Sequence, residues 1–419
     1  MIRNVCVLNS CVLAVVMCIS TQLPAETYRS VITSVTHNRR TETAEIKSRV
    51  VTPECPVKWS VSKRTLHGGK QQGVELVVID NGRIQITVVP TRGMGILNVS
   101  AGDLRLGWDS PVKEVVHPQF VNLESRGGLG WVEGFNEWLC RCGLESNGHP
   151  GPDTFINNVG DEATMNLTLH GKIANIPARE VEVLIDQQPP YRIRLRGRVD
   201  ERLLFGPKLE LHTEISTVPG SSEFELKDVV VNAGAQDQEF QMLYHANYGR
   251  PLLEQGAQLV APASRVTPFN AHAAAGIENY AVYKGPTTGY VERVYLMKLF
   301  ADADHRTQIV LRNQAGDRGV SMAWDVTQLP YLTVWKNTGA VQDGYVTGLE
   351  PGTNYPNNRS VERRFGRVPK LKPGARYEMA ITFGLLQGRQ AVQGGLSRVQ
   401  SVRNGRKTQV DEQPQSVME

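Results

Sequence analysis

Short runs in which apolar and polar residues alternate, separated by turn residues, cover most of the chain. The clearest pair is residues 74–80 and 83–89, joined by the dipeptide Asn81-Gly82, which is typical of the tight turn of a β-hairpin. Because side chains alternate between the two faces of a strand, such runs predict strands with one apolar face. Further strands of this kind are predicted at residues 96–100, 104–108, 163–169, 180–185, 191–196, 208–215, 223–231, 293–299, 308–312, 319–324, 331–335 and 377–383.

Many short strands with almost no helix predict an all-β protein, a large antiparallel sandwich with one main domain at residues 73–388. A short helical turn is expected only within residues 252–275. Residues 26–72 are polar and irregular, and we expect an N-terminal extension with one or two strands there. After the main domain, residues 389–419 are rich in Gln, Ser, Arg and Gly, which predicts a disordered tail.

The long segment from residue 110 to 160 interrupts this pattern, because it is rich in glycine and aromatic residues. Loops of this length inside a compact domain are usually functional or mobile. Its Trp131, Phe135 and Trp138 could line a platform for a sugar, or they could pack the loop onto the sheet. Both interpretations stay open at this point.

The first 25 residues resemble a signal peptide rather than a strand or a spanning helix. Arg3 is their only charge, residues 5–19 are mostly apolar, and Ala25 is a small residue before Glu26. We therefore expect residues 1–25 to be removed and the mature protein to be secreted or periplasmic. Removal would leave 46 − 1 = 45 basic against 42 acidic residues, a balance that argues against nucleic acid as the main partner.

Cysteine usage gives little support to a disulfide framework or a metal site. Outside the leader the chain has Cys55, Cys140 and Cys142, so a single bridge from Cys55 to either of the other two is the most that could form. A zinc site is disfavoured because the C-x-C spacing lacks the two intervening residues usual in structural zinc sites. We expect neither a metal nor a cofactor.

Four polar residues lie where predicted strands end. Glu350 follows the apolar run 331–335 and stands before a turn rich in proline and glycine, and Arg92 lies in the turn 90–95. His170 and His245 each close an apolar run and have a glycine shortly after them. Any one of these would ordinarily be a structural or solvated residue. Together, in comparable settings, they indicate a site at one face of a sheet.

The segments around these residues resemble a known family. The order TRGMG (91–95), LHGKIANIPA (169–178), YHANYG (244–249) and GLEPGTNYPN (348–357) is similar to the aldose 1-epimerase, or galactose mutarotase, superfamily. It is most similar to a divergent bacterial branch that has long been classified as a domain of unknown function. The resemblance covers about residues 60–388 and implies the galactose mutarotase-like β-supersandwich as the fold.

The resemblance also implies roles for individual residues. Glu350 is similar to the catalytic base of the mutarotases and His245 to their general acid, while His170 and Arg92 are similar to groups that hold the sugar near its ring oxygen. The chain departs from the family in lacking its Asn-Arg signature, and Asp325 matches the sugar-gripping aspartate by position only. The predicted substrate-binding set comprises Arg92, His170, Trp131, Glu133, Asn136, Asp325 and Asn354.

Three functions are therefore open. The first is an exported enzyme that epimerises a small sugar, oligosaccharide or sugar derivative at the anomeric carbon or interconverts another epimeric pair. The second is a polysaccharide lyase or hydrolase; a hydrolase needs a second carboxylate about 5 to 10 Å from Glu350, for which Glu133 and Glu137 are candidates. The third is a non-catalytic carbohydrate-binding protein that stacks sugars on Trp131 and Trp138.

Overall fold

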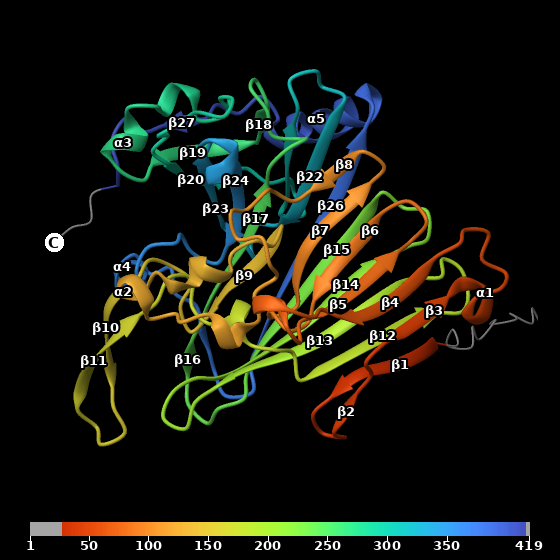
Figure 1. Cartoon of the computed structure of the whole chain (residues 1–419). Helices are drawn as coiled ribbons and strands as arrows, with labels where there is room; N and C mark the ends of the chain where they lie inside the picture. The colour runs from red at the N-terminus through yellow and green to blue at the C-terminus, as the bar shows by residue number, and fades with distance from the viewer. Residues whose placement is uncertain (1–26, 416–419) are drawn as a thin grey trace, which may run out of the picture.

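Two large β-sheets pack face to face in the computed structural model, which describes residues 27–415 of the 419-residue chain. In Figure 1 the strands β4 to β7 of one sheet lie in front of the strands β13 to β15 of the other. The two sheets enclose one continuous apolar core, so the predicted all-β sandwich is confirmed. The predicted leader lies outside the described residues.

The first sheet has ten strands, all paired antiparallel. In spatial order they are β18 (Gln258–Val260), β21 (Arg306–Arg312), β22 (Arg318–Asp325), β26 (Arg376–Gln387), β15 (Glu223–Asn232), β14 (Lys208–Thr217), β13 (Ile193–Arg202), β12 (Glu180–Asp186), β1 (Thr27–Ser34) and β2 (Arg39–Arg40). We refer to it as sheet A.

The second sheet, sheet B, has thirteen strands and carries the candidate site. It is antiparallel except that β27 pairs with β19 in parallel. Its order is β27 (Gln409–Val410), β19 (Ala263–Pro268), β20 (Arg293–Leu299), β23 (Tyr331–Asn337), β24 (Val346–Gly352), β17 (Gln241–Tyr248), β9 (Leu139–Leu144), β7 (Gly95–Ala101), β6 (Gln85–Val89), β5 (Glu75–Asp80), β4 (Ser60–Thr65) and β3 (Ala44–Lys47), with β8 (Leu104–Leu106) on β7.

Two small ladders and a few short helices complete the described chain. The ladders are β10 (Gly151–Ile156) with β11 (Glu162–Leu167), and β16 (Gln238–Glu239) with β25 (Lys370–Leu371). The helices are α1 (Ser48–Val51), α2 (Ser125–Gly128), α3 (Ala271–Ala274), α4 (Arg359–Arg364) and α5 (Arg389–Arg403), with 3₁₀ turns η1 (Gly69–Gln71), η2 (Pro118–Phe120), η3 (Gly130–Gly134), η4 (Ile173–Asn175), η5 (Ile277–Asn279) and η6 (Val341–Asp343). Among residues 27–415, no helix is long and apolar enough to cross a membrane.

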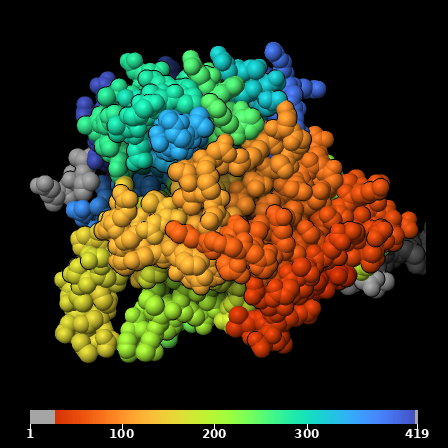
Figure 2. All heavy atoms as spheres, in the orientation of Figure 1, coloured from red at the N-terminus to blue at the C-terminus, as the bar shows by residue number. Residues whose placement is uncertain are grey.

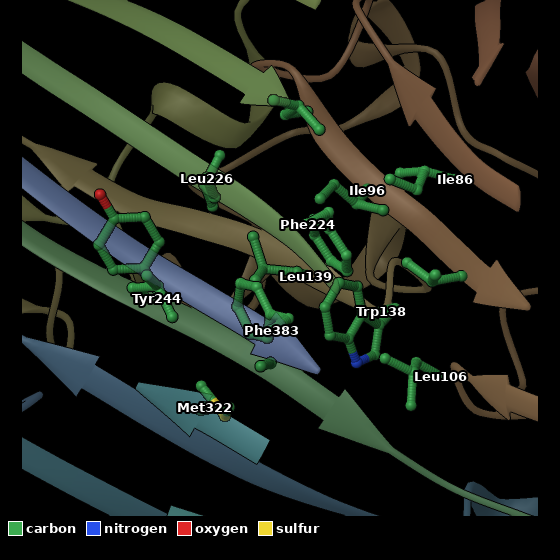
Figure 3. Packing of buried hydrophobic residues seen from close by; sticks show 14 of the residues in the cluster. Ile86, Ile96, Leu106, Trp138, Leu139, Phe224, Leu226, Tyr244, Met322 and Phe383 are labelled. Atoms are coloured by element: carbon green, nitrogen blue, oxygen red, sulfur yellow. The ribbon is translucent and has the colours of Figure 1, made fainter. Parts of the chain in front are cut away.

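Aromatic residues from both sheets meet in the core. Trp138, which precedes β9, lies edge-on to Phe383 of β26 with ring centroids 5.0 Å apart, and Phe383 stacks on Phe224 of β15 at 5.1 Å (Figure 3). Trp138 is fully buried. The prediction that Trp138 could be a sugar-stacking platform is therefore wrong, because its ring packs between the two sheets.

Charged groups also join the sheets. Arg141 of β9 forms a two-pronged ion pair with Asp228 of β15, with Nε to Oδ2 at 2.5 Å and Nη2 to Oδ1 at 2.9 Å. The hydroxyl of Tyr244 donates to the same carboxylate over 2.9 Å. Since Arg141 and Tyr244 point into the core, their strand neighbours Cys140, Cys142 and His245 face the opposite side of sheet B. This alternation places the site on the outer face.

Two predicted boundaries differ from the structure. The segment 27–72 is not a separate extension, because β1 joins sheet A while β3 and β4 join sheet B. The prediction of a disordered tail is wrong from residue 389, where α5 begins. Val392, Leu396 and Val399 lie one helical turn apart and pack on Val310 and Leu386. This narrow apolar stripe lies in an otherwise polar segment, which is why composition alone did not reveal it.

Candidate functional site

The part of the long Gly-rich segment before residue 139 covers the outer face of sheet B, whereas residues 139–144, predicted as loop, form β9 within that sheet. Its Trp131 and Phe135 form a second apolar cluster with Trp108, Cys140, Cys142, Ala174, Leu243 and Val346. Trp131 and Phe135 lie 4.6 Å apart between ring centroids, and both are buried. The loop thus excludes water from the strands beneath it. All three cysteines of the described chain are free thiols, so the bridge considered from the sequence does not form.

The register of sheet B aligns the chemistry in one row. His245 pairs with Cys140, and Glu350 pairs with Thr333. The pairs Leu243–Gly352 and Ala246–Leu349 place His245 opposite Glu350. Paired residues on neighbouring strands point to the same face, so the row Cys140, His245, Glu350 and Thr333 lies under the loop. Local sequence sets each strand, but the pairing between distant strands creates this row.

His245 and Glu350 form a direct buried pair in contact but without a hydrogen bond, since Oε1 of Glu350 has no hydrogen-bond partner among the described residues. Nε2 of His245 lies 3.2 Å from Oε1 of Glu350, and the two side chains are only 6% and 2% exposed. Burial lowers the pKa of His245 well below its usual value, and the nearby His170 adds to this. Burial also raises the pKa of Glu350 well above its usual value, with a further contribution from the charge of Glu292. Both shifts favour a neutral imidazole beside a protonated carboxyl group.

His170 reaches the same place from the loop after β11. Its ring lies edge-on to that of His245, with centroids 5.3 Å apart, and edge-on to Trp131 at 4.7 Å. Its Nδ1 lies 2.9 Å from the carbonyl oxygen of Asn147, an acceptor, so Nδ1 carries the proton. Burial lowers the pKa of His170 to about 4. At neutral pH the ring is therefore uncharged, and its Nε2 can accept a hydrogen bond.

Asn354, which was predicted to bind substrate, supports His170 from behind. Asn354 and Asn147 exchange two amide hydrogen bonds, of 3.0 and 2.8 Å, and both side chains are fully buried. The same Asn147 offers its carbonyl oxygen to His170. Asn354 thus holds the residue that orients His170, and its own amide is occupied by protein contacts.

Arg92 is buried in an ion pair rather than exposed to a pocket. Its Nε donates to Glu137, and its Nη1 donates to the carbonyl oxygen of Val116 over 3.1 Å and to Asn175 Oδ1 over 2.9 Å. Both partners of the ion pair are fully buried. Nη2 of Arg92 is buried and has no hydrogen-bond partner among the described residues. The main contacts of Arg92 therefore tie the covering loop to the end of β6.

Three of the predicted binding residues lie away from the His245–Glu350 pair. Glu133 accepts a hydrogen bond of 2.5 Å from Ser125 within the loop, which lowers its pKa. Asn136 donates to the carbonyl oxygens of Val112 and Glu114. Asp325 ends β22 in sheet A, where it accepts from the backbone and hydroxyl of Thr327. These three predictions are not supported, because each side chain serves its own loop or turn.

The structure also adds residues that the sequence did not point to. Trp335 of β23 lies on the face of Glu350, with its ring 5.5 Å from that of His245, and donates to Glu292 over 2.7 Å. Asn247 accepts from His245 Nδ1 at 2.7 Å. Strand alternation could have indicated both residues, because Asn247 stands two positions after His245 and Trp335 stands two positions after Thr333. No sequence pattern pointed to Glu292, because its loop comes to the site only through tertiary folding.

A separate groove of about 1340 Å³ lies between the β10–β11 hairpin and the turn after β13. Figure 2 shows it as the hollow between the yellow and the green projections. Its lining includes Glu145, Ser146, Thr168 and Gly171, which are chain neighbours of Asn147 and His170. Neither His245 nor Glu350 lines it. The segments that orient His170 therefore separate the buried pair from this groove.

Comparison with known proteins agrees with this geometry. The profile of a family described as "Domain of unknown function (DUF4432)" matches residues 71–385. The chain belongs to this family. The DUF4432 chain is 40% identical to a protein from Klebsiella pneumoniae subsp. pneumoniae MGH 78578, provisionally named an aldose 1-epimerase, whose crystal structure it matches with a TM-score of 0.88 over 93% of this chain and 100% of that one. No curated protein sequence matches the DUF4432 chain.

A more distant neighbour shows the fold alone. A galactose mutarotase-like protein from Clostridium acetobutylicum is 13% identical, with a TM-score of 0.50 over 77% of the DUF4432 chain and 97% of its own. Together these comparisons confirm the predicted resemblance to the aldose 1-epimerase-like proteins and the predicted sandwich. They also support an epimerase-like, sugar-related enzyme fold.

Proposed function

We propose that the protein is an enzyme that epimerises a free sugar at its anomeric carbon, with Glu350 as the base and His245 as the acid. The observation that carries the proposal is the buried contact of 3.2 Å between His245 Nε2 and Glu350 Oε1. A carboxyl group and an imidazole at this distance can serve the two oxygens of one hemiacetal. The likeness to a crystal structure provisionally named as an aldose 1-epimerase supports the same reaction class.

The proposed reaction needs two proton transfers that run together. The Glu350 carboxylate takes the proton of the anomeric hydroxyl, while the protonated His245 gives the proton on Nε2 to the ring oxygen. The bond between the anomeric carbon and the ring oxygen then breaks, and the open-chain aldehyde forms. After the aldehyde end rotates, the same two transfers in reverse close the ring on its other face.

The neighbours of the pair suit a hydroxylated ligand. His170, neutral at neutral pH, can accept a hydrogen bond from a sugar hydroxyl through Nε2. Trp131 Nε1 is a buried donor without a hydrogen-bond partner among residues 27–415, and Thr333 Oγ1 is likewise unpaired. Such groups usually find partners, because leaving a buried polar group unpaired costs about 1 to 3 kcal/mol. Apolar ring faces beside polar edges are typical of sugar sites.

A hydrolase remains the second candidate, on one specific observation. Glu133 and Glu137, the second carboxylates considered from the sequence, are held by Ser125 and by Arg92. The charge of Glu292, in contrast, acts on Glu350 and raises its pKa. Glu292 is exposed and bonded to Trp335 at the edge of the site. An acid near the base is what a glycoside hydrolase would require.

One assay separates these functions. The purified protein is added to freshly dissolved single anomers of several aldoses, and optical rotation is followed, beside reducing-end and unsaturated-end assays on a polysaccharide panel. We expect faster approach to the anomeric equilibrium for at least one aldose and no new chain ends. New reducing ends without faster rotation would favour the hydrolase instead, and unsaturated ends a lyase. Sugar binding with neither effect would make the protein a carbohydrate-binding protein.

We also propose that the enzyme acts outside the cytoplasm. This rests on the sequence of residues 1–25, with Arg3 before the apolar run 5–19. Mass spectrometry of the intact protein, expressed with its full leader in a Gram-negative host and recovered from the periplasmic fraction, should show a chain that begins near Glu26. Recovery in the cytosol with an intact Met1 would contradict the proposal.

A further inference from the structure

Asn247 lies directly behind the proposed acid. It stands two residues after His245 on β17, so the two side chains share the outer face of sheet B. Oδ1 of Asn247 lies 2.7 Å from Nδ1 of His245, and the Asn247 side chain is fully buried. The contact is therefore shielded from water and is the hydrogen bond that the described structure gives to Nδ1.

The orientation of the Asn247 amide follows from its other two contacts. Its nitrogen lies 3.1 Å from the carbonyl oxygen of Glu137 and 3.0 Å from the carbonyl oxygen of His245. Carbonyl oxygens only accept, so the donating NH₂ group must face them. The amide oxygen therefore faces His245, whose Nδ1 must donate. A neutral His245 then carries its proton on Nδ1 and presents the lone pair of Nε2 to Glu350.

We propose that Asn247 is a positioning residue that locks His245 in the Nδ1–H tautomer, so that Nε2 and Glu350 share a single proton and the pair resets itself without solvent. This inference rests on the proposed function and specifies how its acid is loaded. The two atoms that would exchange the proton lie 3.2 Å apart in a buried site, and Oε1 of Glu350 has no hydrogen-bond partner among the described residues, so it is free to take one.

The proton count is constant through the cycle. In the resting form Glu350 is protonated and His245 is neutral; transfer of that proton to Nε2 gives a carboxylate and an imidazolium, which is the form needed for ring opening. Opening returns one proton to Glu350 from the anomeric hydroxyl and removes one from His245 to the ring oxygen, which restores the resting form. Ring closure runs both transfers backwards: Glu350 gives its proton to the aldehyde oxygen, and Nε2 of His245 takes one from the sugar hydroxyl. The carboxylate and imidazolium needed for the next opening are thereby regenerated. The opposite tautomer, with the proton on Nε2, could not accept at that atom and would interrupt the cycle.

The other groups that face the pair do not compete for Nδ1. His170 meets the His245 ring edge-on. Cys140 lies opposite His245 on β9, and burial raises the pKa of its thiol. From the strand beyond, Thr333 adds only a hydroxyl. Glu292 acts on Glu350 by charge, and the buried ion pair of Arg92 with Glu137 lies behind Asn247. Asn247 is therefore the group that decides which nitrogen holds the proton.

The test reads the tautomer directly. In the full-length protein with histidine rings labelled with ¹⁵N, the two ring nitrogens of His245 are observed by NMR and assigned by their loss in His245→Asn. We expect the Nδ1–H tautomer at neutral pH. An Nε2–H tautomer in the wild-type protein would overturn the inference. This measurement needs no substrate, so it stands or falls separately from the proposed epimerase activity.

Variants extend the test to the function of the lock. Asn247→Leu keeps the approximate size but removes the acceptor, and we expect Nε2–H to become populated and kcat to fall about 10- to 10²-fold with KM within a few-fold. Asn81→Leu is a matched control, because Asn81 is equally buried but serves the turn between β5 and β6. It should lower stability without changing the His245 signals. Unchanged ring signals and kcat in Asn247→Leu would refute the role, and the wild-type spectrum decides the tautomer even if this variant does not fold.

Discussion

Arg92 provides a prediction in which the resemblance and the structure point to different roles. The resemblance implies that Arg92 grips the sugar, whereas its contacts show a buried ion pair with Glu137 and hydrogen bonds to Val116 and Asn175. Arg92→Met removes the guanidinium and leaves the Glu137 carboxylate buried without its counter-ion. Breaking such a pair from one side typically costs about 3 to 5 kcal/mol in the free energy of unfolding.

A second substitution isolates the cause of that loss. In Arg92→Met/Glu137→Leu no charge remains in the buried site, so the double variant should be more stable than Arg92→Met by about 1 kcal/mol or more. Arg196→Met is the matched control, because Arg196 pairs with Glu214 over 2.6 Å but is half exposed. Loss of this surface pair should change stability by only about 0 to 1 kcal/mol.

Equilibrium unfolding in urea, followed by tryptophan fluorescence, measures the three variants, and anomer exchange measures their activity. Because Arg92 fixes the loop that bears Trp131 and Phe135, we expect kcat and KM of Arg92→Met to worsen together with its stability. The reasoning would be refuted if Arg92→Met lost less than about 1 kcal/mol while its sugar affinity collapsed. Arg92 would then bind the substrate directly, as the resemblance implied.

Three further predictions concern pH and packing. The pKa of His245 is lowered and that of Glu350 is raised, so the pair keeps one proton over a wide pH range and kcat should be flat around neutral pH. Glu292→Gln removes a charge that raises the pKa of Glu350. The alkaline limb of its pH–rate profile should therefore lie at lower pH than in the wild-type protein. The pKa of His170 falls from 6.5 to about 4 on folding, so its contribution to stability is present above about pH 6.5 and is lost as the pH falls towards 4. Urea titrations between pH 6.5 and 4 should show that His170→Asn loses less unfolding free energy than the wild-type protein as the pH falls. Trp138→Ala should cost about 3 to 5 kcal/mol in unfolding free energy with an unchanged KM, and a large rise in KM without a stability loss would contradict its place in the core.

The sequence predicted many of the strands because their signal is local, but it did not identify β9, β17 and β24, the neighbouring strands that carry most of the candidate site. The Asn81-Gly82 turn and the alternation around it identify β5 and β6 almost to the residue. The pair His245 and Glu350, separated by 105 residues, was reached through the resemblance. The predicted strand-end position was wrong for both, because His245 lies inside β17 and Glu350 inside β24. Strand pairing itself could not be derived, since no local pattern states which strand lies beside which.

The contacts that differ from the predicted roles have physical causes of the same kind. Arg92 and Asn354 stand beside segments of the candidate site, but their polar atoms bond to protein groups brought in from distant loops. Asp325 belongs to the other sheet, which no spacing along the chain reveals. Glu292 was missed because it lies in a segment without pattern and reaches the site only through its contact with Trp335.

Anomer exchange in wild-type protein and in Glu350→Gln is the measurement that tests the central claim most directly. Exchange NMR on an equilibrated sugar that the wild-type protein interconverts gives the turnover rate of each, and titration of the sugar gives its affinity. Because glutamine keeps the size but cannot take a proton, we expect turnover to fall about 10²- to 10⁴-fold with affinity within a few-fold. Near-wild-type exchange in folded Glu350→Gln would contradict the account, since the buried pair with His245 would then not perform the reaction.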